Sequence, residues 1–394
     1  MAVYNVLNVG QGDSIMIKPP NGCTFCGETI FIDLGPGKYD VTQNIAEDEM
    51  VHIFFTHHDN DHLEGFRFFI GKMKQVREIT VPLYQNEITL IARAILNLKG
   101  IGKSSDCNEF TRALSELVNN QAIIKTLVEG NKECPKLSFA YEGKGFCDHI
   151  ECLNPPQIMD SYDWIHEVDE SALVQLMDEV FTKEFAREME LYVNANNTRY
   201  DNALVDSREF NRFWLYDGEN EWRREIRYAK CNYVLNFIMQ NREMFKQFNE
   251  KSTRNNLKRI YKNYVKCVHD VCIVLKTSFE SETMLLTGDA SKKVFNRLIQ
   301  EGRDISASHL KMPHHGSKHN MNKKILNKIK PEVAIISHDN GHFGTAKDSH
   351  PNQEILELLQ NKKIKILITN DVIKNNVTIM EKYKHKDDFY VSIL

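Results

Sequence analysis

The sequence predicts an α/β fold in which functional side chains lie at the carboxyl ends of strands. Apolar runs typical of buried strands, at residues 51–55 and 282–286, each end in a polar cluster. Stretches with the three-and-four spacing of amphipathic helices alternate with the later strands, the first of them at 291–299. Because α/β architectures build their sites at the carboxyl ends of strands, we expect the polar clusters to meet at one edge.

The composition limits the class of protein. The chain has 394 residues, of which 42% are hydrophobic, enough for a large core or two domains. A formal net charge of −4 is small for this length, so a nucleic-acid surface would have to be local. We find no leader pattern at the N-terminus and no stretch near the roughly 20 apolar residues of a membrane span. Nine cysteines, an odd number, favour reduced thiols, and we expect a cytoplasmic protein without membrane contact.

The densest chemical signal follows the strand at 51–55. His57, Asp59, Asp61 and His62 offer two imidazoles and two carboxylates within one tight turn. Holding that much polarity beside a core is costly unless it is paired, and divalent metal ions supply the opposing charge. A solvated acidic loop that happens to contain histidines is the alternative. We favour a metal site.

The later elements repeat this local order. Most of the 15 histidines fall in three windows, 57–62, 309–319 and 338–350, which suggests one site assembled by folding. The strand at 282–286 is followed by Asp289. After the helix at 291–299 come a short strand at 308–312 with His314 and His315 behind it, a further helix, a strand at 333–337, and a loop that ends at His350.

Five segments in order resemble the metallo-β-lactamase-fold hydrolases, and most of all the hydrolase domain of ComEC-type DNA-uptake proteins. The segments are NVGQGDS at 8–14, FIDLG at 31–35, THHDNDH at 56–62, LLTGDA at 285–290 and LKMPHHGS at 310–317. One such motif is weak, whereas five in order are specific. The resemblance covers about residues 1–156 and 269–394. The membrane-spanning part of the uptake proteins is absent, so uptake itself is not implied.

The resemblance implies an αββα sandwich, the metallo-β-lactamase fold, in which residues 1–156 and 267–394 form a hydrolase domain. Residues 157–266 interrupt it as a mostly helical insertion, a candidate surface for a protein partner. Near its end, Arg254, Lys258, Lys262 and Lys266 repeat every four residues and would form one basic stripe on a helix. Such a stripe would bind a phosphate backbone. A solvated helix face is the alternative.

The resemblance also implies a centre with two divalent metal ions. The expected ligands are His57, Asp59, Asp61 and His62, with Asp289 as a bridge and one histidine of the pair His314 and His315 closing the second site. Asp59 stands where many members have histidine. This raises the share of oxygen ligands and makes Mn²⁺ as reasonable as Zn²⁺.

Other residues near the motifs have narrower expected roles. Asp61 would also orient the attacking hydroxide. His350 would hold a substrate phosphate or protonate the leaving group, unless it is only a capping or surface residue. Lys311 is a second candidate for stabilising the leaving oxygen. We expect Asp33 to orient a ligand histidine rather than form an Asx turn, and we expect turn chemistry for Asp13.

Two questions stay open from the sequence. His269 is either an additional ligand of the first metal or an ordinary polar residue at a strand start; the DNA-uptake subgroup usually has asparagine there. Cys23 and Cys26 form a CxxC pair that Cys147, His149 and Cys152 would complete as a zinc site. Free thiols are favoured, because the spacing of the second half fits no common zinc pattern.

The function we expect is metal-dependent phosphodiester hydrolysis. The substrate would be DNA or RNA, and the nucleophile a hydroxide activated by two metals, zinc or manganese. A hydrolase of a small phosphodiester or ester is one alternative, because the fold does not fix the function. Another is a partner-activated component of a larger assembly, such as a defence system.

Overall fold

The computed structural model describes residues 2–57, 59–82, 136–156, 268–279, 282–339, 350–370 and 390–393. The chain divides into two compact units, the first made of residues 1–84, 138–157 and 268–394 and the second of 85–137 and 158–267. The described residues belong to the first unit, apart from 136 and 137. The predicted helical insertion at 157–266, with Arg254, Lys258, Lys262 and Lys266, lies outside the described residues, so its structure and its basic stripe stay predictions.

Seven of the described strands form a first, mixed sheet in the order β14-β1-β2-β3-β4-β5-β6. Their bounds are β1 Val3–Leu7, β2 Ile15–Lys18, β3 Glu28–Ile32, β4 Met50–Phe54, β5 Val76–Pro82, β6 Lys136–Ala140 and β14 Tyr390–Ile393. Strands β3, β4 and β5 are parallel neighbours, whereas β2 runs antiparallel to both β1 and β3. The inner strands are buried on both faces, as their nearly continuous apolar runs predict.

A second described sheet also has seven strands, in the order β13-β12-β11-β10-β9-β8-β7. Their bounds are β7 Gly145–Cys147, β8 Ile150–Asn154, β9 Val274–Phe279, β10 Glu282–Leu286, β11 His309–Lys311, β12 Val333–Ile336 and β13 Lys365–Ile368. Strands β10 to β13 are parallel, and β9 runs antiparallel to β10. Both sheets thus combine an antiparallel hairpin with a run of parallel strands.

Helices cover the outer faces of the sheets. The described α-helices are α1 Asn60–Leu63, α12 Lys292–Gln300, α13 Lys323–Ile329 and α14 Gln353–Asn361, and the 3₁₀ helices are η1 Val41–Asn44, η2 Glu64–Gln75, η4 Val268–Asp270 and η5 Pro313–Gly316. The side chain of Ser291 accepts a hydrogen bond from the Lys293 amide and begins α12, which is the helix predicted for 291–299. None of the helices in the described ranges has the length and hydropathy that a membrane span requires.

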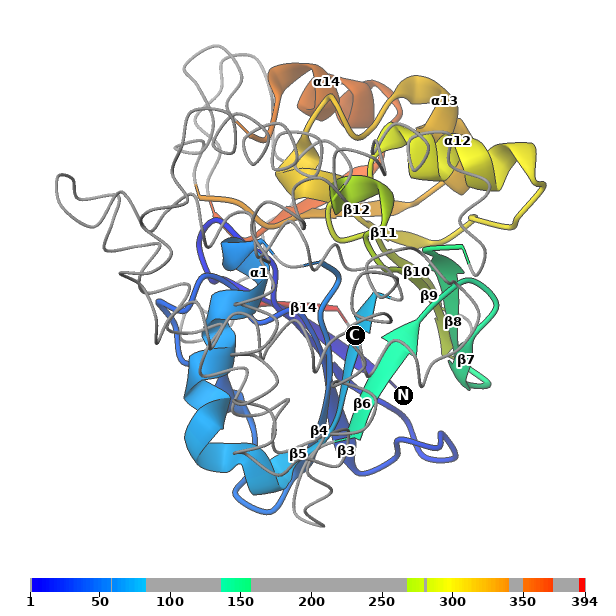
Figure 1. The fold of residues 1–394 in the computed structure, drawn as a ribbon. Helices are drawn as coiled ribbons and strands as arrows, with labels where there is room; N and C mark the ends of the chain where they lie inside the picture. The colour runs from blue at the N-terminus through cyan, green and yellow to red at the C-terminus, as the bar shows by residue number, and fades with distance from the viewer. Residues whose placement is uncertain are drawn as a thin grey trace, which may run out of the picture. The chain divides into compact units, whose positions relative to one another are not determined.

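Buried side chains join these elements into layers. One cluster contains Val6 and Phe54 from the first sheet and Leu275 and Leu286 from the second, so the two sheets pack face to face. A second cluster joins β10 to β13 with α12, α13 and α14, which gather on one side of that sheet (Figure 1). On the outer face of the first sheet, Phe69 of η2 packs edge-on against Phe31 of β3, with ring centroids 5.8 Å apart. The layers are helix, sheet, sheet and helix.

The strand directions bring several loops to one edge of the structure. Asp33 follows β3, residues 57–62 follow β4, Asp289 follows β10, and His314 and His315 follow β11. Strands β2 and β9 run against their neighbours and start at the same ends, because Ile15 pairs with Ile32 and Leu275 with Leu286. The 8–14 loop before β2 and the helix η4 before β9 therefore reach the same edge.

Candidate metal centre

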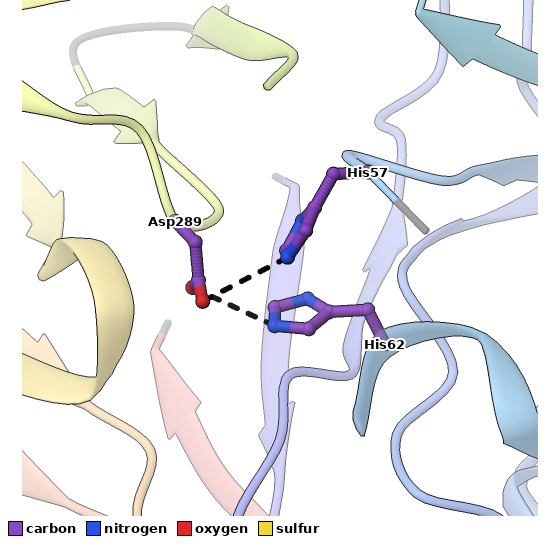
Figure 2. A group of neighbouring side chains, drawn as sticks. All are labelled: His57, His62 and Asp289. Atoms are coloured by element: carbon purple, nitrogen blue, oxygen red, sulfur yellow. Dashed lines mark ion pairs between the residues drawn. The ribbon is translucent and has the colours of Figure 1, made fainter. Parts of the chain in front are cut away.

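Asp289 lies at the centre of a group of histidines. Its carboxylate is almost fully buried, with Oδ1 3.5 Å from His62 Nε2 and Oδ2 3.8 Å from His57 Nε2 (Figure 2). Asp289 Oδ1 and both Nε2 atoms are buried and make no hydrogen bond with any residue in the described ranges. Buried polar atoms are rarely left in that condition, so this place in the fold calls for a ligand.

One set of potential metal-ligand atoms lies around Oδ2 of Asp289. Asp59 Oδ2 lies 3.5 Å from His57 Nε2 and 3.6 Å from His269 Nε2. The His269 nitrogen is 3.9 Å from Asp289 Oδ2. We call His57, Asp59 and His269 subsite 1; their ligand atoms all lie within 4.8 Å of one another. The half-buried His314 is adjacent, with its Nε2 3.7 Å from Asp289 Oδ2.

A second set lies on the Oδ1 side. His315 Nε2 is 3.3 Å from Asp61 Oδ2, and both group with His62 within 4.8 Å. We call Asp61, His62 and His315 subsite 2. Two ligands bonded at about 2.0–2.2 Å to one cation lie roughly 3–3.6 Å apart, so the shortest of these spacings suit shared coordination.

The histidine rings are held so that their Nε2 atoms present lone pairs. His62 Nδ1 donates to Asp33 Oδ2 at 2.7 Å, and His315 Nδ1 donates to the Ser337 carbonyl at 3.0 Å. Both partners are pure acceptors, which places the ring proton on Nδ1. Nε2 of each ring is then an acceptor that faces carboxylate oxygens. Acceptors facing acceptors repel one another unless a cation or a proton lies between them.

His57 and His314 also carry their ring proton on Nδ1, because each donates it to a neutral side chain. The Thr56 hydroxyl donates to Asp33 Oδ2 at 2.6 Å, so it accepts from His57 Nδ1 at 3.0 Å. The Asn320 side chain donates its NH₂ group to the carbonyls of Asp289 and Ala290, which turns its Oδ1 toward His314 Nδ1 at 3.1 Å. Asn320 therefore fixes the tautomer of His314, in the manner of outer-shell partners of metal-bound histidines.

The electrostatics of the cluster also suit a cation. Burial alone would lower the pKa of His62, but Asp289, Asp33 and Asp61 raise that pKa well above its ordinary value. Burial alone would raise the pKa of Asp289, but the surrounding imidazoles, led by His314, hold that pKa well below its usual range. Protons on the histidines and bound cations are alternative ways of balancing these carboxylates. The residues present thus fit two divalent ions that share Asp289.

The loop after β11 has a strained backbone at the site. His314 and His315 both adopt left-handed conformations, with φ of 48° and 53°. Such conformations are uncommon outside glycine and tend to persist at functional sites that over-determine them. Because consecutive residues of this turn point in different directions, His315 is directed into subsite 2 and His314 toward His269 and Asp289. Both members of the pair lie at the cluster.

Gly12 positions the loop that contains Asp61. Its φ is +144°, and a Cβ there would lie 2.3 Å from the Asp61 carbonyl oxygen. We expect Gly12→Ala to displace Asp61 and to lower by about tenfold or more any metal-dependent hydrolysis that the cluster supports, in line with losses from small misplacements of reacting groups. Gly22→Ala, where a Cβ would meet nothing within 4 Å at a similarly positive φ, is the matched control. Equal activity in the two variants would contradict this role.

The structure places Asp33 against the predicted centre. Its carboxylate accepts hydrogen bonds from the Thr56 amide, the Thr56 hydroxyl and His62 Nδ1. The contact with a histidine of the motif is therefore present, and its role toward a bound metal stays a prediction. His269, which the sequence left open, lies in subsite 1.

The turn chemistry expected for Asp13 was wrong, and the burial of Lys311 argues against its expected contact with a leaving oxygen. The hydrogen bonds described for the Asp13 carboxylate go to Lys311 and Ser337, not to the amides of its own turn. The Lys311 ammonium is fully buried and lies 2.7 Å from Asp13 Oδ2. An ammonium held in a buried ion pair cannot also contact a leaving oxygen of the substrate.

His350 is buried at the rim of the cluster. Its ring packs edge-on against His314, with centroids 4.8 Å apart. It therefore lies near enough to act beside the centre, and its predicted catalytic role remains to be tested. Asn320, Thr56 and Ser337 were missed by the sequence analysis, because nothing in their local sequence marks a hydrogen bond to a distant histidine.

The zinc site that the CxxC pair left open gains no support from the described residues. Cys23, Cys26, Cys147 and Cys152 are free thiols, and the groups with metal-ligand geometry found there do not include them. His149 Nδ1 is hydrogen-bonded to the Ser278 carbonyl at 2.9 Å. Free thiols were the favoured interpretation.

Comparison with known proteins gives a partial relationship. No protein-family model matches the chain. A stretch of 102 residues, 26% of the chain, is 33% identical to ComE operon protein 3 of Bacillus subtilis (strain 168). That stretch covers 12% of the length of the relative, so the chain spans a small part of it. The similarity relates part of this chain to a ComE operon protein.

Proposed function

We propose that this protein is a metal-dependent phosphodiesterase of the metallo-β-lactamase type that cleaves nucleic acid. The observation that carries the proposal is the convergence of histidine Nε2 atoms and the Asp59, Asp61 and Asp289 carboxylates. Three of these potential ligand atoms, His57 Nε2, His62 Nε2 and Asp289 Oδ1, are buried and make no hydrogen bond with the described residues. A structural cluster would be expected to satisfy those atoms with protein partners. The order of layers and the position of the loops at strand ends support the same fold family.

The two subsites have defined roles in this proposal. His57, Asp59 and His269 would hold one ion, Asp61, His62 and His315 the other, and Asp289 both. When bound, the ions would lower the pKa of a water molecule and neutralise charge on the phosphoryl oxygens. Asp61 is the half-buried carboxylate of subsite 2, and it would accept a hydrogen bond from the attacking water and orient it.

Substrate would approach from the side of the cluster that is exposed. The side chains of Asp59, His269 and His314 retain 40%, 21% and 22% of their accessible surface, whereas His57 and His315 are fully buried. His314 and His350 lie together at this rim. Of the two, His350 is the imidazole that we propose protonates the leaving oxygen, because the His314 ring proton is held on Nδ1 by Asn320.

Nucleic acid is the proposed substrate on two grounds. One is the resemblance of the five motifs to DNA-uptake hydrolases, together with the partial similarity to a ComE operon protein. The other is the basic stripe expected at Arg254, Lys258, Lys262 and Lys266. A phosphate backbone held by these residues would be recognised without regard to base sequence.

The test is cleavage of single- and double-stranded DNA and RNA with Mn²⁺, Zn²⁺ or Mg²⁺. The variant is Asp61→Ala/Asp289→Ala, and the control is Asp48→Ala/Asp148→Ala, which removes two exposed carboxylates. We expect cleavage by wild type and control that is lost in the cluster variant and in excess chelator. If wild type cleaves no nucleic acid but hydrolyses bis(4-nitrophenyl) phosphate, and the cluster variant does not, then nucleic acid is the wrong substrate and phosphodiester hydrolysis by the cluster still stands. No turnover of either would overturn the proposal.

Asn320 gives a further prediction within this proposal. Asn320→Leu removes the acceptor for His314 Nδ1, so the His314 ring is free to rotate and to change its tautomer. We expect the rate of cleavage to fall by about tenfold, at the lower end of losses from outer-shell partners. Asn322→Leu, a helix-cap variant at the start of α13, is the control for local destabilisation. A rate loss that simply follows loss of folded protein in both variants would contradict the role of Asn320.

A further inference from the structure

A buried ion pair lies behind subsite 2. Asp13 and Lys311 are 1% and 0% exposed, and Lys311 Nζ lies 2.7 Å from Asp13 Oδ2. Lys311 Nζ also donates to the Met312 carbonyl at 3.1 Å, and the Ser337 hydroxyl donates to Asp13 Oδ1. The pair joins the loop before β2 in the first sheet to β11 in the second.

Stability alone is a weak reason for such a pair. Taking two charges out of water is expensive, and replacement of a buried ion pair by apolar residues of similar volume is often neutral or stabilising. A polar network of this kind instead fixes one arrangement of the groups that it contacts. The groups that Asp13 contacts are therefore the informative ones.

Asp13 reaches all three members of subsite 2. Ser337, which donates to Asp13, also supplies the carbonyl that fixes His315 Nδ1, and that nitrogen lies 3.6 Å from Asp13 Oδ1. The Asp13 amide donates to the Asp61 carbonyl at 3.3 Å. Asp13 also groups with Asp33 and His62 within 4.8 Å. The contacts described for Asp13 and Lys311 do not include His57, Asp59 or His269.

We propose that Asp13 and Lys311 are positioning residues that set the geometry of subsite 2 and not that of subsite 1, an inference that rests on the proposed metal centre. Asp13 fixes Ser337 and the Asp61 loop, and through them the two ligands. Lys311 neutralises Asp13, so that its carboxylate does not compete with the Ser337 carbonyl for the His315 proton. The pair acts through other residues and touches no substrate.

The experiment compares zinc binding by wild type and by Asp13→Asn/Lys311→Met, which removes both charges and nearly preserves volume. The control is Lys276→Met/Asp304→Asn, which also removes both charges of an ion pair, because the described contacts of Lys276 and Asp304 do not include a residue of the cluster. Zinc affinity is measured by competition with a chromogenic chelator, and folding by circular dichroism. We expect two ions per chain in wild type and control. In the variant the first ion should bind unchanged and the second at least tenfold more weakly.

The possible results distinguish a failure of this inference from a failure of the proposed function. If the folded variant binds both ions as wild type does, the pair is only structural and the inference is wrong, while the proposed function stands. If wild type binds neither Zn²⁺ nor Mn²⁺, the proposed centre and this inference fail together. If the double variant does not fold, Ser337→Ala replaces it, because it removes the hydroxyl donor to Asp13 and keeps the carbonyl for His315. That variant should weaken the second ion selectively, and equal weakening of both ions would overturn the inference.

Discussion

Asp289→Asn is expected to abolish binding of both metal ions and to lower phosphodiester cleavage by about a hundredfold to a thousandfold, the loss typical of removing one key electrostatic group. Asp289 is the residue shared by the subsites, with Oδ1 toward His62 and Oδ2 toward His57 and His269. Asparagine has the same shape but a single oxygen and no charge, so it cannot bridge two cations. Turnover of bis(4-nitrophenyl) phosphate and metal content per chain measure the effect.

The same substitution should change how stability depends on metal. A ligand at about 100 times its Kd stabilises the folded state by about 2.7 kcal/mol, so chelation should lower the Tm of wild type. The Tm of Asp289→Asn should not respond to chelator. Asp304→Asn is the control, because Asp304 is an exposed carboxylate whose described side-chain contacts, with Lys276 and Ser306, do not include the cluster. A variant that still binds two ions, or a wild type whose Tm ignores the chelator, would contradict the shared role of Asp289.

The elements that carry the site could be predicted because their signals are local. The strand at 51–55 corresponds to β4, one residue earlier, and the helix at 291–299 to α12. The cluster at 57–62 and Asp289 were found because each follows a strand, and parallel strands bring their ends together. Local pattern and tertiary arrangement agree at these residues, which is the condition for reading a structure from its sequence.

The partners of these residues could not be predicted, for a physical reason. The acceptors for His315 and His314 are the Ser337 carbonyl and Asn320 Oδ1, and any residue can offer a carbonyl. Asp13 looked like a turn residue because its glycine neighbours dominate the local pattern, while its cation is 298 positions away. His314 and His315 could not be distinguished because the left-handed backbone that separates them is a tertiary property.

Asp33→Asn is the second large effect that we expect, a loss of about tenfold to a hundredfold in metal affinity. Asp33 accepts from three donors, and asparagine can satisfy only some of them with its single oxygen. If that oxygen keeps the Thr56 amide, the new NH₂ group faces His62 Nδ1 and draws its lone pair. The ring proton then moves to Nε2, where it blocks a ligand position. Asparagine tolerates the φ of 59° at this position, so backbone strain does not explain the loss.

The effect should reach both subsites, because Thr56 relays it. With an NH₂ group at position 33, the Thr56 hydroxyl must accept a hydrogen bond from that group. Its own proton then goes to His57 Nδ1, which moves the proton of the His57 ring to Nε2 as well. Thr56→Val removes only this branch, so it should weaken one ion where Asp33→Asn weakens two. Long-range ¹H–¹⁵N NMR of the histidine rings reports the tautomers directly. If both rings keep the Nδ1–H tautomer in Asp33→Asn, then Asp33 does not set the tautomers of His62 and His57, and it acts only by packing beneath the cluster.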